Sequence, residues 1–162
     1  METEGRVPKI SQYGSVDPAP PSVNTVVADL TQRLCDESLP MFQRMRAVFS
    51  LRNQRTEDAC LALCEGFVSE SALLRHEIAY VLGQMQNKAA LPTLIERLSD
   101  EKEHVMVRHE AAEAMGAIGD RSVIQILEKF STDPLPEVAE SCIVALDLLA
   151  WVEGAEFHDT DG

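Results

Sequence analysis

The chain has 162 residues, enough for one domain of ordinary size. Hydrophobic residues make up 45 % of it and aromatic residues only 5 %, so the core must be largely aliphatic, which favours packed helices over a β-sandwich. With 27 acidic and 14 basic residues, the net charge of −13 disfavours nucleic acid and anionic membranes as partners; it can attract a basic partner or serve solubility alone.

Residues 1–21 are predicted to form a flexible tail, because four prolines and two glycines interrupt them and leave little to bury. The first four residues lead into no apolar run, so we expect no signal peptide. No apolar run in the sequence reaches the ~20 residues that a membrane span needs. The four cysteines include no C-x-x-C pair, which disfavours a zinc ribbon, and the expected compartment is the reducing cytoplasm.

Residues 22–152 are predicted to form a lobe of helical repeats, followed by an acidic C-terminal tail at residues 153–162. The segment 74–79 resembles 107–112 at an offset of 33 residues, and fainter copies place Arg44-Met45 and Glu140-Ser141 where these copies have His-Glu. Each copy contains two amphipathic segments, with turn signals at residues 86–88 and 119–121. This period predicts an all-α fold, a HEAT-like α-solenoid of about four helical hairpins.

Two of the four histidines occupy the same repeat position, and each precedes a glutamate, in His76-Glu77 and His109-Glu110. Equivalent positions in stacked repeats point the same way, and neighbouring helices pack about 8–10 Å apart, so both pairs should face one surface. Two imidazoles and two carboxylates suit iron, manganese or zinc, whereas calcium and magnesium prefer oxygen ligands alone. The alternative is a solvated charged face copied along with the repeat; recurrence in register favours the metal.

Three further side chains are candidates for supporting roles. Glu113 lies one helical turn beyond His109 and is predicted to accept the second N–H of its imidazole, while Tyr80 stands in the same relation to His76. Met106, three residues before His109, could line a groove beside the metal. Each of these three could instead be an ordinary surface or core residue of its helix.

Four residues next to these pairs are assigned structural roles. Arg75 and Arg108 are predicted to form ion pairs between repeats with acids at or near the two His-Glu pairs. Gly83 and Gly116, again 33 residues apart, are predicted to let neighbouring helices approach closely.

Four segments of the chain, residues 71–77, 80–84, 106–111 and 113–118, resemble deoxyhypusine hydroxylase, and the similarity runs from about Ser15 to about Leu149. The resemblance implies a HEAT-repeat dyad of two similar halves, each with two His-Glu pairs. The four pairs of such a dyad hold two Fe(2+) ions that activate dioxygen. The implied reaction is hydroxylation of the deoxyhypusine residue of translation factor 5A, which completes hypusine.

Carried over residue by residue, the resemblance makes His76, His109 and Glu110 iron ligands. Glu77 would be a further ligand or the carboxylate that receives the ammonium groups of the substrate, and Met106 would lie near the substrate tail. The acidic surface would suit a substrate of this cationic kind.

The chain departs from the family pattern because residues 15–21 resemble the segment that joins the two halves. It therefore resembles the C-terminal half alone, with two His-Glu pairs in place of four, and a second lobe is expected as a partner. The chain could be a fragment, a subunit of a split enzyme, or a homodimer that rebuilds the dyad. The rival functions are a non-enzymatic HEAT-repeat scaffold that binds a basic protein and an inactive isolated half of the hydroxylase.

Overall fold

The structure, a computed structural model, describes residues 8–159, with side chains as far as Gly154. Within these residues, extended structure is limited to one bridge between Ile10 and Val16. The remainder is helical: α1 (Val27–Cys35), α2 (Met41–Gln54), α3 (Glu57–Glu65), α4 (Ala72–Met85), α5 (Leu91–Ser99), α6 (Val105–Ile118), α7 (Ile124–Phe130) and α8 (Pro136–Asp159), with three single-turn 3₁₀ helices between them.

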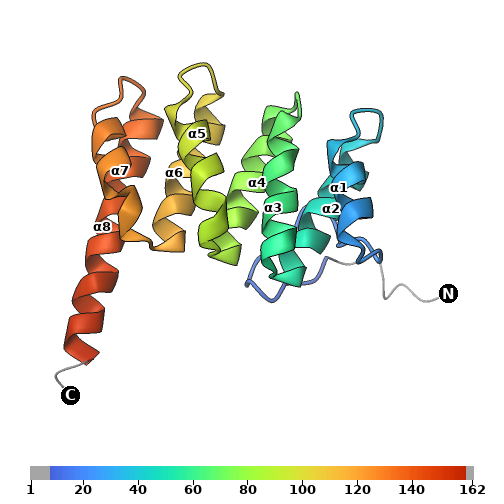
Figure 1. Cartoon of the computed structure of the whole chain (residues 1–162), viewed down its shortest axis with the longest axis horizontal. Coiled ribbons are helices and arrows are strands. Elements are labelled where there is room, and N and C mark those ends of the chain that lie inside the picture. The colour runs from blue at the N-terminus through green and yellow to red at the C-terminus, as the bar shows by residue number, and fades with distance from the viewer. Residues whose placement is uncertain (1–7, 160–162) are drawn as a thin grey trace.

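The helices form two layers along a solenoid (Figure 1). The long-helix layer consists of α2, α4, α6 and α8, in which each helix packs against the next; the short-helix layer consists of α1, α3, α5 and α7. The prediction of an all-α, HEAT-like solenoid is confirmed. α8 extends beyond the other helices at one end of the solenoid (Figure 1).

The ends of the helices follow ordinary capping chemistry. Thr56 and Ser71 begin α3 and α4, because their hydroxyl oxygens accept the free N–H groups of Ala59 and Leu74. The residues after α4 and α6, Gln86 and Gly119, adopt left-handed φ values of 54° and 78°, which end both helices. The predicted turns at residues 86–88 and 119–121 therefore lie where the sequence placed them.

Two glycines bring the long helices into close contact. A Cβ atom on Gly83 would lie 3.0 Å from the Cα of Ala114, and one on Gly116 would lie 2.9 Å from the Cβ of Ala145. The prediction for Gly83 and Gly116 is confirmed, and the glycine contacts set the spacing of α4, α6 and α8.

The three 14-residue helices α2, α4 and α6 share one register, since the fourth residue of each is an arginine. Arg44 and Arg108 are buried, and the Nε–H of each donates to a carbonyl ten residues earlier, that of Leu34 or Leu98. Arg44 is therefore the equivalent of Arg75 and Arg108. The predicted alignment of Arg44-Met45 with the His-Glu pairs was wrong by one residue, and Met45-Arg46 holds that place in α2.

The predicted ion pairs of the other two arginines do form between repeats, but with other acids. Arg75 contacts Glu103 at 2.7 Å, and Arg108 contacts Asp133 at 2.8 Å. Both acids lie in the connections that precede the next long helix, because the fourth residue of a helix is close to the loop at its N-terminal end.

Residues 8–21, placed by sequence in a flexible tail, pack against α2 in the structure. Asp17 forms a 2.6 Å ion pair with the fully buried guanidinium of Arg52, Tyr13 donates a hydrogen bond to the carbonyl of Arg52, and Ala19 is buried. At the other end, α8 continues to Asp159, so the predicted end of the helical lobe at residue 152 was too early. Residues 1–7 and 160–162 lie outside the described residues, and the assignment of separate domains stays a prediction.

In the part of the chain that the structure describes, we find no helix with the length and apolar character that a bilayer crossing requires.

Candidate metal centre

The candidate site lies on the second turn of α4 and α6. His76 and His109 are the fifth residues of these helices, and Glu77 and Glu110 are the sixth. The shared register places each His-Glu pair at the same height in the long-helix layer. Successive residues diverge by about 100° around a helix, so each histidine can turn toward the next helix rather than toward its own glutamate.

Glu110 is the residue on which the site converges. One of its carboxylate oxygens, Oε1, lies 3.1 Å from Nε2 of His76 and 3.4 Å from Nε2 of His109. Its side chain is 11 % exposed, and burial raises the pKa of this carboxyl above its usual range, against the opposing effect of His76. The structure thus brings together three of the four predicted ligands around one oxygen.

Glu77, the fourth predicted ligand, lies beside His76 but outside this junction. Its Oε1 is 3.9 Å from Nδ1 of His76, and burial raises its pKa above the usual range. His76 opposes this rise, Asp17 adds to it, and Arg52 lowers the pKa of Glu77. Nδ1 of His76 is buried and has no hydrogen-bond partner among the described residues, which leaves this nitrogen available to a bound group.

The predicted partner of the second His109 nitrogen was wrong. Glu113 faces Nε2, at 3.7 Å, the same nitrogen that faces Glu110. The other nitrogen, Nδ1, lies 2.5 Å from the hydroxyl of Ser141, which itself donates to the carbonyl of Glu137 at 2.6 Å. The hydroxyl has one hydrogen, so it accepts from an Nδ1–H, and the Nε2 lone pair is left free for a ligand.

Ser141 was missed as a functional residue, although the sequence contained its signal. The repeat places Glu140-Ser141 where α4 and α6 have His-Glu, so Ser141 is the equivalent of Glu110 one helix further along. Because His76 contacts Glu110, the same relation brings His109 to Ser141.

Tyr80 does not take the predicted position of imidazole partner, and Met106 is not among the residues that line the groove described below. The hydroxyl of Tyr80 accepts a hydrogen bond from Gln84 at 3.3 Å, rather than from His76. Met106 is 41 % exposed on the first turn of α6 and belongs to the surface. A role of Met106 at the substrate stays a prediction.

An open groove of about 390 Å³ begins at Glu110 and runs along the contact between α4 and α6. Its lining combines two phenols, two carboxylates, two amides and a floor of small side chains: Tyr13, Tyr80, Gly83, Gln84, Gln86, Glu110, Glu113, Ala114 and Ala117. The groove volume falls within the range of small-molecule sites.

Residues 61–147 match the family model described as HEAT repeats, which is more than half of the chain. The chain belongs to the HEAT-repeat family. It is also 51 % identical over 150 residues to deoxyhypusine hydroxylase of Danio rerio, covering 93 % of this chain and 49 % of that protein. The human deoxyhypusine hydroxylase is 47 % identical over 162 residues, covering 100 % of this chain and 54 % of the human protein.

A solved structure of human deoxyhypusine hydroxylase in complex with glycerol superposes with a TM-score of 0.87 at 49 % identity, covering 91 % of this chain and 51 % of that one. The resemblance found in the sequence is confirmed, and the chain spans about half the length of the curated relatives that it matches. Which half it represents stays a prediction from residues 15–21.

The donor atoms of the site suit a transition metal. His109, Glu110 and Glu113 each offer one ligand atom, and these atoms lie within 4.8 Å of one another. His76 adds a second imidazole, whose buried Nδ1 has no hydrogen-bond partner in the part of the chain that the structure describes. Mixed imidazole and carboxylate donors with an open side are typical of non-haem iron sites and less suited to calcium or magnesium.

Proposed function

We propose that this chain is one lobe of a non-haem di-iron monooxygenase that hydroxylates the deoxyhypusine residue of translation factor 5A and so completes hypusine. The observation that carries the proposal is the convergence of His76 and His109 on Glu110, in a fold superposable on half of a deoxyhypusine hydroxylase. The two Fe(2+) ions would belong to a complete dyad, to which a second lobe contributes its own ligands.

Within this lobe, His76, His109 and Glu110 would hold iron, and Glu77 would either join them or receive an ammonium group of the substrate. Iron bound there would supply the activation of dioxygen that insertion of an oxygen atom into a C–H bond requires. Ser141 would hold the ring of His109 in one orientation and one tautomer. Glu77 and Glu110 are largely buried, and burial would strengthen the electrostatic attraction between their carboxylates and a bound cation.

Two further parts of the proposal concern partners and place. The partners would be translation factor 5A carrying deoxyhypusine and the second lobe, present as another copy of this chain or as a separate half. The four cysteines, Cys35, Cys60, Cys64 and Cys142, are all free, and the reducing cytoplasm is the compartment we expect.

The test begins with the purified chain loaded with ferrous iron under anaerobic conditions. Iron per chain and the oligomeric mass are measured, and the protein is then given dioxygen, a reductant and factor 5A carrying deoxyhypusine. Mass spectrometry of the factor detects the added oxygen atom. The double substitution His76→Ala and His109→Ala should remove the iron, whereas His104→Ala, which removes an exposed imidazole at the start of α6, should retain it.

Each outcome distinguishes between possible functions of the chain. About one iron per chain, a dimer and hydroxylation would mean that two copies rebuild the dyad. Iron on a monomer without hydroxylation would mean a lobe that needs a separate partner or an inactive half, and adding the missing half decides between them. Full iron content in the double variant would contradict the ligand assignment, and a wild-type chain without iron would favour the scaffold.

A further inference from the structure

The last helix of the solenoid, α8, has an apolar outer surface that takes no part in the metal centre. We propose that this surface is a docking site for a basic amphipathic helix of a partner protein. The residues that would make the contact, the α8 stripe, are Val144, Leu148 and Trp151, with Ile143 and Val152 at its edges. This inference goes beyond the proposed function and does not depend on it.

The α8 stripe is both apolar and exposed. Val144, Leu148 and Trp151 follow one another at intervals of four and three residues, so they lie on one face of the helix. They are 59 %, 39 % and 71 % exposed, and Ile143 beside them is 45 % exposed. Single apolar residues are common on protein surfaces, but a continuous row of large ones indicates an interaction site.

The outer side of α8 has no neighbour in the described part of the chain. α8 packs against α6 and α7, and no helix lies beyond it (Figure 1). At the other end of the solenoid, residues 8–21 pack against α2 and bury Ala19. Terminal repeats of a solenoid ordinarily have a polar outer face, so the apolar face of α8 is suited to a partner.

The repeat shows that the stripe is particular to α8. Val144 and Leu148 lie 31 residues after Glu113 and Ala117, which is the offset that relates the equivalent residues of α8 and α6. α6 therefore has a carboxylate and a small side chain at the positions where α8 has two larger aliphatic ones. The α8 stripe is thus not a by-product of the repeat pattern that builds the solenoid.

A further repeat of the same solenoid would fit this side of α8 poorly. Gly116 lets α8 pack closely on α6, because a Cβ atom there would lie 2.9 Å from the Cβ of Ala145. The equivalent residue on α8 is Asp147, which is larger and charged. A docked helix must therefore stay farther from the backbone of α8 and make its contacts through side chains of the α8 stripe.

The charges around the α8 stripe decide which kind of helix it can bind. Glu140 and Asp147 are exposed next to the stripe, and neither forms an ion pair among the described residues. Glu153 is already paired with Arg121. The sequence contains no lysine or arginine after Lys129. Lysines or arginines beside the apolar residues of a partner helix would complement these acids, whereas a second α8 or an anionic membrane would be repelled.

Trp151 is the only tryptophan of the chain, so its fluorescence reports directly on the α8 stripe. The probe is a synthetic three-heptad helix without aromatic residues, with leucine at positions a and d and lysine at e and g. A peptide with glutamate in place of lysine tests the charge, and a peptide with the same residues in scrambled order tests the apolar stripe. Anisotropy of the labelled peptides gives the affinities of the variants.

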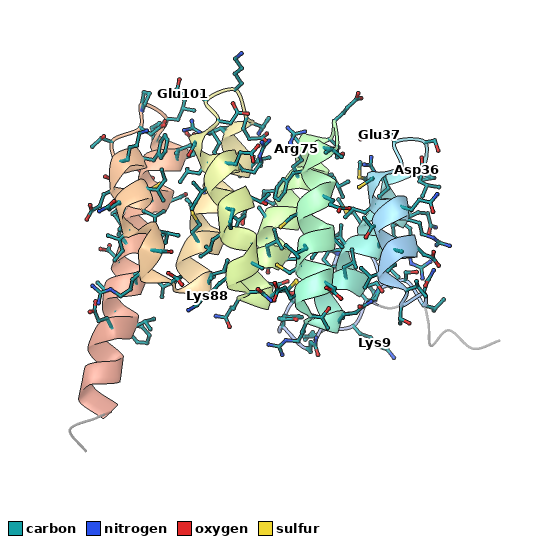
Figure 2. All side chains as sticks on the ribbon, viewed as in Figure 1. Lys9, Asp36, Glu37, Arg75, Lys88 and Glu101 are labelled. Atoms are coloured by element: carbon teal, nitrogen blue, oxygen red, sulfur yellow. The ribbon has the colours of Figure 1, made fainter. Side chains whose placement is uncertain are left out.

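The variants of the chain separate the stripe from the rest of the surface. Leu148→Ser removes an apolar contact, and Val23→Ser is its matched control, because Val23 is 94 % exposed and precedes α1. Asp147→Asn removes one acid beside the stripe. Glu101→Gln is the control for charge, since Glu101 lies in the loop between α5 and α6, at the end of the solenoid opposite the extension of α8 (Figure 2).

We expect the lysine peptide to shift the emission of Trp151 to shorter wavelength and the other two peptides to leave it unchanged. Leu148→Ser should weaken binding of the lysine peptide about tenfold and Asp147→Asn about fivefold, while both controls stay within about twofold of the wild type. Circular dichroism of each variant checks that it is folded.

Three results would overturn the inference. Equal binding of the scrambled peptide, or equal effects of Leu148→Ser and Val23→Ser, would show a general attraction to the acidic surface. A concentration-dependent emission shift of the chain alone, lost in Leu148→Ser, would assign the stripe to a second copy of the chain. An emission shift with zwitterionic lipid vesicles but not with the lysine peptide would assign it to a membrane surface.

Discussion

α4 and α6 contain the same motif in the same register, yet their histidines have different surroundings. In both helices the histidine at the fifth position contacts the sixth residue of the next long helix. For His76 that residue is Glu110, a carboxylate, whereas for His109 it is Ser141, a hydroxyl. One stacking rule therefore gives a carboxylate oxygen beside the imidazole at one position and a hydrogen bond from the imidazole to a hydroxyl at the next.

This rule also explains why the candidate site is confined to two helices. Before α4, the fifth residue of α2 is Met45, which offers no imidazole to Glu77. After α6, the equivalent of the glutamate is Ser141, so the row of carboxylates ends. Two departures from the repeated motif, Met45 in α2 and Ser141 in α8, thus set the boundaries of the site. The neighbouring repeats pack against the site without contributing a His-Glu pair.

The largest contrast between α4 and α6 is expected at the arginines in the fourth position of each helix. Arg108 and its partner Asp133 have side chains that are 2 % and 6 % exposed. Arg108→Met would leave the carboxylate buried without a cation, so we expect it to lower the free energy of unfolding by about 3–5 kcal/mol. In α4, the equivalent Arg75→Met should cost at least about 1 kcal/mol less, because Glu103 keeps its contact with Arg97 at 3.1 Å.

Urea unfolding of the two variants and the wild type measures this contrast. A larger loss for Arg75→Met than for Arg108→Met would show that a second cation does not compensate for the first. Asp133→Asn combined with Arg108→Met is the control, since removing both charges should recover part of the loss.

Ser141→Ala is expected to have the next largest effect, and on metal binding rather than on folding. Without the hydroxyl, Nδ1 of His109 loses its partner, and loss of such an orienting hydrogen bond typically weakens metal binding 10–100-fold. Ferrous-iron titration of the purified chain measures this affinity.

Ser131→Ala is the matched control for the serine. Its hydroxyl also donates to a backbone carbonyl, that of Glu128, but it lies just after α7 in the short-helix layer. Equal iron affinity of Ser141→Ala and the wild type would refute the orienting role of Ser141.

Substitution of the two glycines should lower the free energy of unfolding by smaller amounts, and by about the same amount in each helix. Gly83→Ala and Gly116→Ala each place a Cβ about 3 Å from the backbone of the neighbouring helix. Overpacking of this kind costs about 1–3 kcal/mol and the gain in helix propensity offsets up to about 1 kcal/mol, so each variant should lose about 1 kcal/mol in thermal or urea unfolding.

Iron binding should separate the two glycine variants. Gly83→Ala moves α4 away from α6 and so separates His76 from Glu110, whereas Gly116→Ala leaves that contact in place and disturbs the one between His109 and Ser141. We expect Gly83→Ala to weaken iron binding more. The reverse order would place the centre nearer to α8 than the geometry does.

The sequence was sufficient for the repeat architecture because repetition appears directly in the residue pattern. The 33-residue offset predicted the shared register, and the two glycines predicted the close helix contacts. The predicted register of α2 was wrong by one residue, because α2 has no His-Glu pair and its Arg44 took the place of the histidine instead of the arginine before it. The burial of Arg44 against the carbonyl of Leu34, visible only in three dimensions, identifies it with Arg108.

The site was less predictable from sequence than the fold, because side-chain direction decides which residues meet. Helical spacing placed Glu113 on the same face as His109, but it could not show which ring nitrogen faces which helix. Ser141 was visible in the repeat alignment only as the residue that replaces a glutamate. The contact of Tyr13 with the groove depends on the fold of residues 8–21, for which a proline-rich sequence gives no periodic signal.

The smallest expected effect is a pH dependence that distinguishes two buried carboxylates, Glu110 in α6 and Glu103 in the loop before it. In the metal-free chain, burial raises the pKa of Glu110 above its ordinary value of 4.5. The folded state then holds its proton more tightly than the unfolded state, so the stability from this group is complete below pH 4.5 and is lost as the pH rises through the folded pKa. We therefore expect the unfolding free energy of the wild type to fall relative to Glu110→Gln as the pH rises above 4.5.

Glu103 should give the opposite sign. Burial alone would raise its pKa, but the hydrogen bonds from Arg75 and Arg97 and from the backbone of His104 lower it overall. Its stabilising contribution is complete above the unfolded pKa of 4.5 and is lost as the pH falls through the lower folded pKa. The wild type should therefore gain on Glu103→Gln as the pH rises toward 4.5, whereas its loss to Glu110→Gln begins above 4.5. Urea unfolding of the three metal-free proteins at several pH values measures both slopes. Slopes of the same sign would mean that the histidines around Glu110 act on it as the arginines act on Glu103, and that Glu110 already has a sufficient counter-charge before any metal binds.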